Sequence, residues 1–437
     1  MSLPRRFVRL AFGGLALVVV VSVFVLRPAP TAAPQTPQTA ATPPATVGSL
    51  DAVARLQQKI DSGEVTLGFD ADRGYLASLL KNLDIPVSSQ LLVFAKSSAQ
   101  MSGISPSRPR AIYFNDEVYV GWVQEGALEL AAVDPASGPF FYTLTQEGTA
   151  KPAFERHTSS CVGCHDSSED PARLIPRLLK LSVVPDREGR AIQSAALATI
   201  DRSPFKERWG GWYVTGTHGR QVHMGNQTFR EPEGNFGSIP EFIANVDLTP
   251  GANVTDLAGR FDTKRYLTPH SDIVALMALG HQTHVSNLIA VATHRLVAAL
   301  VTDPKVDATS LARELGEPIV RSMLFSGEAL LTDPVAGTSG FAAEFAKRGP
   351  RDTRGRSLRD LDLRTRLLQH PLSYMVYSAS FDGMPAIVKE YVYRRFREVL
   401  GGTDQSSVFA HLTASDREAI LTILQETKPD FAAFTAK

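Results

Sequence analysis

The sequence predicts an α+β protein with an N-terminal membrane anchor, a small antiparallel β-containing region and then a mostly α-helical region. Three observations predict this class. An uncharged apolar run fills residues 10–26, β-branched and aromatic runs separated by turn residues fill residues 110–146, and helical apolar spacing dominates from Ser271 onward. With 437 residues and 43% hydrophobic side chains, the chain is long enough for two or three domains.

Residues 1–27 have the pattern of a signal-anchor or transmembrane helix. Three arginines precede the apolar run and Arg27 ends it. A helix over residues 10–26 spans about 26 Å, which is close to the short limit for a hydrocarbon core of about 30 Å. The run also fits the core of a cleaved signal peptide. Because Pro34 follows the nearest small-residue cleavage sequence, we favour an uncleaved anchor with its basic end inside.

Residues 28–48 are rich in Pro, Ala and Thr and carry no charge. Such a stretch cannot bury a core, so we expect an extended tether. Residues 49–150 then predict a mixed α/β region. The expected elements are helices over Leu50–Ile60 and Tyr75–Leu83, a buried strand within Gln90–Lys96, and an antiparallel meander over 110–146.

The second half of the chain predicts mostly helices. A long apolar helix is expected over Ser271–Val301. Ser415 and Glu418 have the spacing of a capping box, which predicts a final helix that ends near Glu426. Shorter helices are expected over Arg173–Leu181, Ser310–Leu315, Gly340–Lys347, Arg359–Leu368 and Pro385–Leu400.

The chemistry of the chain is concentrated in Cys161-Val162-Gly163-Cys164-His165. These two cysteines are the only ones in the sequence. A zinc ribbon needs further Cys or His ligands at fixed spacing, so a Cys-rich zinc site is excluded. A Cys-x-x-Cys pair also fits thiol–disulfide exchange, but redox motifs of that kind rarely place His directly after the second Cys. Covalent haem attachment is therefore favoured over thiol redox chemistry.

The motif resembles the attachment signature of c-type cytochromes. The resemblance implies that Cys161 and Cys164 form thioethers with one haem c and that His165 ligates its iron. It also implies a haem c domain over residues 151–437. Apolar residues near the motif are candidates to cover the ring, although each is also an ordinary core residue: Phe154, Leu174, Ile175, Leu178, Leu179 and Leu181.

A Gly-rich stretch after the motif supplies candidates for the sixth iron ligand. Met224 lies about as far beyond the motif as the axial methionine of small class I cytochromes, which the chain resembles weakly here. Met224 and His223 are the first candidates and His218 is the next. The alternative is that these residues only pack and that the iron is five-coordinate or ligated elsewhere. His281 and His284 share a helix face and are a weaker candidate pair for a metal.

The second half also resembles large single-haem bacterial cytochrome-like proteins of undefined role. The stretches that carry this resemblance are Thr268–Val274 and Gly340–Phe345. The resemblance implies no particular reaction.

The composition and the predicted compartment limit the classes of function that the chain can have. Because 45 basic and 45 acidic side chains cancel, the chain lacks the basic excess typical of nucleic-acid binders. The export signal and the haem motif together predict a soluble domain in the periplasm, anchored to the inner membrane. The first hypothesis is single-electron transfer to unidentified redox partner proteins. The alternatives are a haem-dependent oxidoreductase of the peroxidase or oxidase type, with His218 or His223 as its acid–base group, and a redox or gas sensor.

Overall fold

The computed structural model describes residues 51–158, 160–166 and 175–435. Six of its strands form one antiparallel sheet in which each strand pairs with the next in sequence. The predicted meander is confirmed, and a sixth strand extends it past residue 150. The strands are β1 (Leu91–Val93), β2 (Arg110–Phe114), β3 (Val118–Trp122), β4 (Leu128–Asp134), β5 (Gly138–Leu144) and β6 (Glu155–His157).

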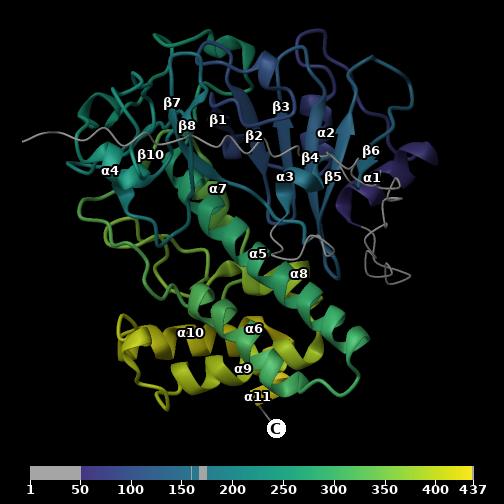
Figure 1. The fold of residues 1–437 in the computed structure, drawn as a ribbon. Coiled ribbons are helices and arrows are strands. Elements are labelled where there is room, and N and C mark those ends of the chain that lie inside the picture. Colours follow the sequence, from purple (N-terminus) through teal and green to yellow (C-terminus); the bar gives the residue numbers. More distant parts are fainter. Residues whose placement is uncertain (1–50, 159, 167–174, 436–437) are drawn as a thin grey trace, which may run out of the picture. The chain divides into compact units, whose positions relative to one another are not determined.

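Helices cover both faces of this sheet (Figure 1). Successive side chains of a strand point to opposite faces. In β4, Leu130 and Ala132 pack with the helices α1 (Ala52–Asp61) and α2 (Leu76–Asn82). Ala131 belongs instead to the core that contains helix α5 (Ile273–Thr302). The two faces of the sheet therefore contribute to separate cores.

Helix α5 is the central element of the fold. Asp272 caps its first turn by accepting hydrogen bonds from the backbone N–H groups of Val274 and Ala275. Its residues from Ile273 to Thr283 are all buried. Among the described residues, α5 alone is long and apolar enough to cross a membrane, and in this fold it packs on the sheet and on α6 (Ala308–Met323).

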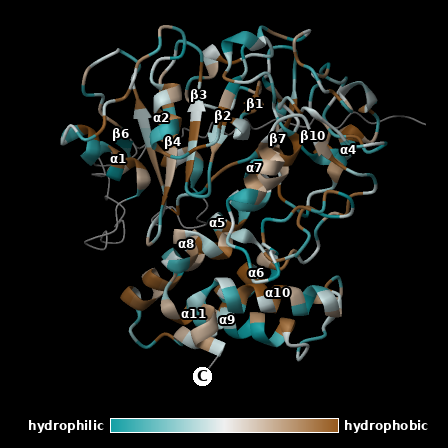
Figure 2. Cartoon of the chain, turned by 180° about the vertical axis from the view of Figure 1, so that it is seen from behind, coloured by the Kyte–Doolittle hydropathy of each residue, from teal (hydrophilic) through white to brown (hydrophobic). Residues whose placement is uncertain are grey.

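Further helices pack together with α6, below α5 in Figure 1. Each carries both hydrophobic and hydrophilic residues (Figure 2), as expected for helices that bury one side. These helices are α9 (Ala386–Leu400), α10 (Ala414–Thr427) and α11 (Pro429–Thr435). The short helices α7 (Phe341–Lys347) and α8 (Ala379–Asp382) pack along α5.

The chain between the sheet and α5 forms only short elements. It contains the hairpin of β7 (Leu181–Pro185) and β8 (Ala191–Ala198), the short helix α4 (Ile239–Ile243), and β9 (Gly216–Thr217), which pairs with β10 (Ala336–Gly337). The mixed α/β class with a small antiparallel sheet is confirmed. The predicted anchor (1–27) and tether (28–48) lie outside the described residues.

Two predicted helices are wrong. Residues 175–180 of the expected helix Arg173–Leu181 are irregular, and Leu181 begins a strand. The expected helix Arg359–Leu368 is a series of turns. A helix pairs its backbone N–H and C=O groups with one another, but in both segments such groups have partners elsewhere. The Leu178 N–H donates to Asn287, and the Leu363 carbonyl accepts from the Val335 N–H.

Candidate functional site

The Cys-x-x-Cys-His motif folds as a single helical turn, α3 (Val162–His165). The backbone N–H groups of Cys164 and His165 both donate to the carbonyl of Cys161, at 3.2 and 3.1 Å. Neither thiol is in a disulfide, and Cys164 is exposed whereas Cys161 is half-buried against the core. Figure 1 shows this turn in front of the sheet near β4. Both sulfurs therefore come from one short turn, with the imidazole directly after them.

The ring of His165 is oriented by a backbone carbonyl. Its Nδ1 lies 2.9 Å from the carbonyl oxygen of Arg177, and because a carbonyl only accepts, Nδ1 is the protonated nitrogen. The Nε2 of the neutral ring then keeps a lone pair, as a metal-binding imidazole requires. Burial lowers the pKa of His165, which favours this neutral form at pH 7. The ring also packs on Phe141 of β5, with centroids 4.6 Å apart.

Helix α5 holds the segment that positions His165. Arg177 N–H donates back to the His165 carbonyl at 2.7 Å. The next residue, Leu178, is bound on both sides of its peptide group by Asn287 of α5. Its N–H donates to Asn287 Oδ1 at 2.7 Å and its carbonyl accepts from Asn287 Nδ2 at 2.8 Å. This pairing explains why the predicted helix is replaced by an extended segment here.

An ion pair on the sheet lies close to the motif. Arg110 of β2 and Glu129 of β4 are joined at 2.9 Å and are largely shielded from solvent. Burial raises the pKa of the Cys161 thiol, and the nearby Glu129 carboxylate adds to this effect. Redox-active Cys-x-x-Cys pairs depend on a lowered thiol pKa. The surroundings of Cys161 act in the opposite direction, which disfavours the thiol-redox alternative.

One histidine beside the motif was not anticipated from the sequence. His157 of β6 is the cross-strand partner of Phe141, whose ring also contacts His165. Its Nε2 lies 2.8 Å from Thr143 Oγ1, and its Nδ1 lies 3.3 Å from the hydroxyl of Ser160. The alternation of a sixth strand would have placed His157 on this face, but the sequence pattern did not reveal that strand.

Met224, the first predicted sixth ligand, lies in a different cluster from His165. It is fully buried among residues of the β7–β8 hairpin and α4. The Ser182 hydroxyl donates to its sulfur at 3.8 Å. His165 and Val162 pack instead with the sheet and α5. Among the described residues, the structure therefore does not bring Met224 and His165 together.

In the other two predicted ligands, His218 and His223, the nitrogen that carries the lone pair already accepts a backbone hydrogen bond. His223 Nδ1 accepts from the N–H of Gly225 at 3.0 Å, and His218 Nε2 accepts from the N–H of Asn253 at 3.0 Å. In a neutral imidazole the remaining nitrogen then carries the proton. Burial, with a smaller effect from His218, lowers the pKa of His223 to about 3. Neither ring offers iron a lone pair in this arrangement.

The His281–His284 pair is packed rather than metal-binding. His281 lies 2.8 Å from the Ser373 hydroxyl and stacks on Phe325, and the guanidinium of Arg202 donates to His284 Nε2 at 3.4 Å. Within residues 51–158, 160–166 and 175–435, no group of three or more His, Cys, Asp or Glu residues is arranged to hold a metal ion. A metal held only by such side chains is therefore not indicated in this part of the chain.

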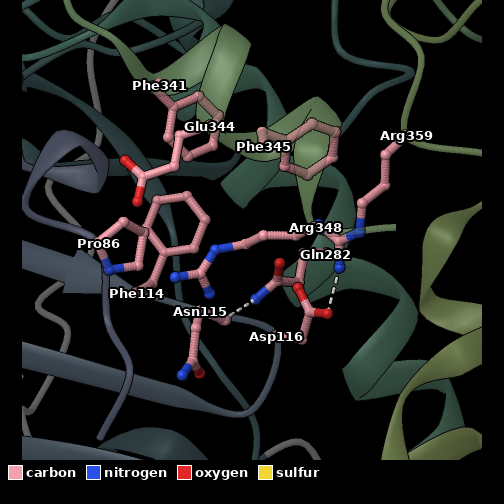
Figure 3. A pocket seen from close by; sticks show the side chains of 10 residues that line it. All are labelled: Pro86, Phe114, Asn115, Asp116, Gln282, Phe341, Glu344, Phe345, Arg348 and Arg359. Atoms are coloured by element: carbon pink, nitrogen blue, oxygen red, sulfur yellow. Dashed lines mark hydrogen bonds and ion pairs between the residues drawn. The ribbon is translucent and has the colours of Figure 1, made fainter. Parts of the chain in front are cut away.

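A small surface pocket lies between the sheet and α7 (Figure 3). Its most buried charge, Arg359, forms an ion pair with Asp116 and stacks on Phe345 and Tyr374. This cation is already neutralised and covered. The pocket contains none of the site residues predicted from the sequence.

Comparison of the chain with protein-family models, with curated proteins and with solved structures gave no match. No relative therefore supplies a family or an activity. The functional conclusion has to come from the motif and from the residues around it.

Proposed function

We propose that this protein is an extracytoplasmic c-type cytochrome that transfers single electrons through one covalently attached haem. The observation that carries the proposal is the orientation of His165. Its Nδ1–H is bound to the Arg177 carbonyl, and its Nε2 lone pair is left for iron. The two free thiols on the same helical turn supply both thioether positions.

The residues around the motif fit the requirements of such a group. Cys161 and Cys164 would hold it covalently, and His165 would be an axial ligand. When bound, the haem supplies a one-electron couple of iron. Of the candidate covering residues, Ile175 and Leu178 are buried next to the segment that orients His165. The protein's own contribution is to hold that imidazole neutral and fixed.

The exposure of Cys164 supports a role in electron transfer. Cys164 is exposed, so the edge of a haem held through it would be reachable from solvent. A redox partner can approach such an edge without entering a pocket. The proposed anchor in residues 1–27 would keep this surface near the periplasmic face of the inner membrane, and unidentified redox proteins would be the partners.

The second candidate function is a haem-dependent oxidoreductase acting on a small molecule. For acid–base chemistry in this function, His157 is a better placed histidine than His218 or His223. His157 is only partly buried, and its Nε2 lies within hydrogen-bond distance of the Thr143 hydroxyl. A histidine with these properties beside the motif is a suitable proton donor or acceptor.

Replacing His157→Ala separates the two functions. If His157 has no part in an electron carrier, the purified protein keeps its absorption spectrum and has no peroxidase or oxidase turnover to lose. If it is an acid–base group, the spectrum is unchanged but peroxidase or oxidase turnover falls about 10²–10⁴-fold. His270→Ala, which removes a histidine in another part of the fold, is the matched control. Identical spectra and turnover in both variants would remove His157 from the site.

A further inference from the structure

Two arginines lie beside the haem motif, and acidic side chains match their charges only in part. The backbone of Arg177 holds His165 on two sides, since its N–H donates to the His165 carbonyl and its own carbonyl accepts from the ring. The side chain of Arg177 therefore starts at the motif. Arg110 comes to the same region from β2 and forms an ion pair with Glu129 of β4.

Both positive charges act on the imidazole of His165. Burial does most to lower its pKa, and the charges of Arg110 and Arg177 lower it further, whereas the Glu129 carboxylate acts in the opposite direction. Two cations and one anion therefore surround the ring. They leave one unmatched positive charge beside the motif.

Arg177 is the arginine whose charge is unmatched. Glu129 is already bound by the Ser98 hydroxyl, at 2.8 and 3.0 Å from its two oxygens, and by Arg110. Gly121 of β3 keeps the place of Arg110 clear, because a Cβ there would overlap its guanidinium. The ion pair is thus fixed on the sheet. Among the described residues, no carboxylate lies within ion-pair distance of the Arg177 guanidinium.

Each arginine also has an Nε–H group without an acceptor. The Nε atoms of Arg110 and Arg177 are shielded from solvent and form no hydrogen bond to the described residues. Buried donors of native proteins nearly always have an acceptor, so these two point to one that the chain does not supply. A carboxylate at the edge of a guanidinium accepts from Nε–H and from one Nη–H together. Arg177 as a whole is only partly buried, so a ligand held by the motif can reach its side chain.

We propose that Arg177 binds a propionate carboxylate of the haem, with the Nε–H of Arg110 as a second donor. This inference rests on the proposed haem function. A haem carries two propionates, which supply the negative charge and the acceptors that the two arginines lack. The positive charge of Arg177 would keep the bound carboxylate ionised in both oxidation states of the iron, and it would favour the ferrous state.

The midpoint potential of the purified haem protein, measured against pH by spectroelectrochemical titration, tests this role. Arg177→Gln removes the charge but keeps the backbone groups that orient His165. Without the arginine, the propionate should take up a proton on reduction. The midpoint potential should then fall as pH rises between about 5 and 7, a slope that the unmodified protein should lack.

Two further variants control for other effects. Arg177→Lys keeps the charge and should restore most of the unmodified profile. Arg187→Gln removes an exposed arginine of the β7–β8 turn and should leave the profile unchanged. Glu129 and His157 also lie beside the motif, but they are present in all of these proteins, so any slope they cause is common to all.

Parallel profiles of Arg177→Gln and the unmodified protein would overturn the proposal, because Arg177 would then act only as a distant charge or not at all. If Arg177→Gln does not fold, the double variant Arg110→Gln, Glu129→Gln removes the second donor without leaving a buried charge unpaired. It should add a smaller slope of the same sign, and an unchanged slope would overturn the proposal. A pyridine haemochrome spectrum separates these results from a failure of the haem function, in which the unmodified protein itself holds no haem.

Discussion

At the scale of single residues, the hydrogen bond on one ring nitrogen decides what the other nitrogen of a histidine can do. In His165, Nδ1 faces a carbonyl, so Nε2 keeps a lone pair. In His218 and His223, one nitrogen faces a backbone N–H, so the other is a donor. The hydrogen bonds therefore agree with His165, the motif histidine, as a potential iron ligand, whereas His218 and His223 are held in a tautomer with no free lone pair.

The buried neutral state of His223 predicts a dependence of stability on pH. Its folded pKa is about 3, whereas an unfolded histidine titrates near 6.5. The folded-state pKa is lowered, so below about pH 6.5 the unfolded chain takes up a proton that the folded chain does not, and stability falls as pH falls. Between pH 6.5 and 4.5 this residue should lower the unfolding free energy by about 2 kcal/mol.

Replacing His223→Asn tests that dependence. Asn keeps an acceptor for the Gly225 N–H but does not titrate, so urea unfolding should show a shallower loss of stability between pH 6.5 and 4.5. His270→Asn is the control for replacing a histidine elsewhere. An unchanged slope in His223→Asn would mean that His223 is already charged or is exposed when folded.

The sequence singled out Cys161, Cys164 and His165 as candidates because the proposed chemistry depends on spacing along the chain. It could not identify the partner of each ring nitrogen. Arg177 follows His165 by twelve positions and contributes a backbone carbonyl, which every residue has. His157 was missed for a related reason. Its place beside Phe141 depends on the pairing of β5 with β6, a contact between strands that no local pattern specifies.

At the scale of elements, α5 connects the folding core to the candidate site. Its N-terminal half is buried, and its Asn287 binds the backbone of Leu178 on both sides. Leu178 follows Arg177, whose carbonyl orients His165. The position of the imidazole is therefore set by a helix more than one hundred residues later in the chain.

Replacing Asn287→Ala should affect both stability and the site. Two hydrogen bonds are lost and the Leu178 peptide group is left without partners, which should lower the unfolding free energy by about 1–3 kcal/mol. The released segment would also orient His165 less firmly, so the absorption spectrum of the haem protein should become sensitive to mild urea. Asn245→Ala, at an exposed asparagine, should change neither. A spectrum that stays constant until global unfolding would contradict this role of α5.

Elements with strong local patterns were predicted well, including the meander and α5. The two failures occurred where side chains took the hydrogen bonds that a helix needs, from a distant partner in one segment and from a local turn in the other. The apolar spacing of 173–181 suits a helix, but at Leu178 the side chain of Asn287 binds both backbone groups. In 359–368, Asp362 accepts from Arg364 N–H and from Thr365, which forms a local turn instead.

At the scale of the whole molecule, the central expectation is a soluble domain attached to the membrane by residues 1–27. Replacing those residues with a cleavable secretory signal should release the protein into the soluble periplasmic fraction with its haem intact. The unmodified protein should stay with the membranes after a carbonate wash. Recovery of the unmodified protein in the soluble fraction would instead support cleavage of the N-terminal segment.

The most direct test of the account is the covalent mass of the mature protein, measured by mass spectrometry after denaturation and accompanied by a pyridine haemochrome spectrum. The account predicts one haem per chain, attached to the peptide that contains residues 161–165, and its complete loss in the Cys161→Ser, Cys164→Ser double variant. Ser203→Ala serves as a control that keeps the haem. A denatured chain from the exported protein that carries only the mass of its amino acids would contradict the account.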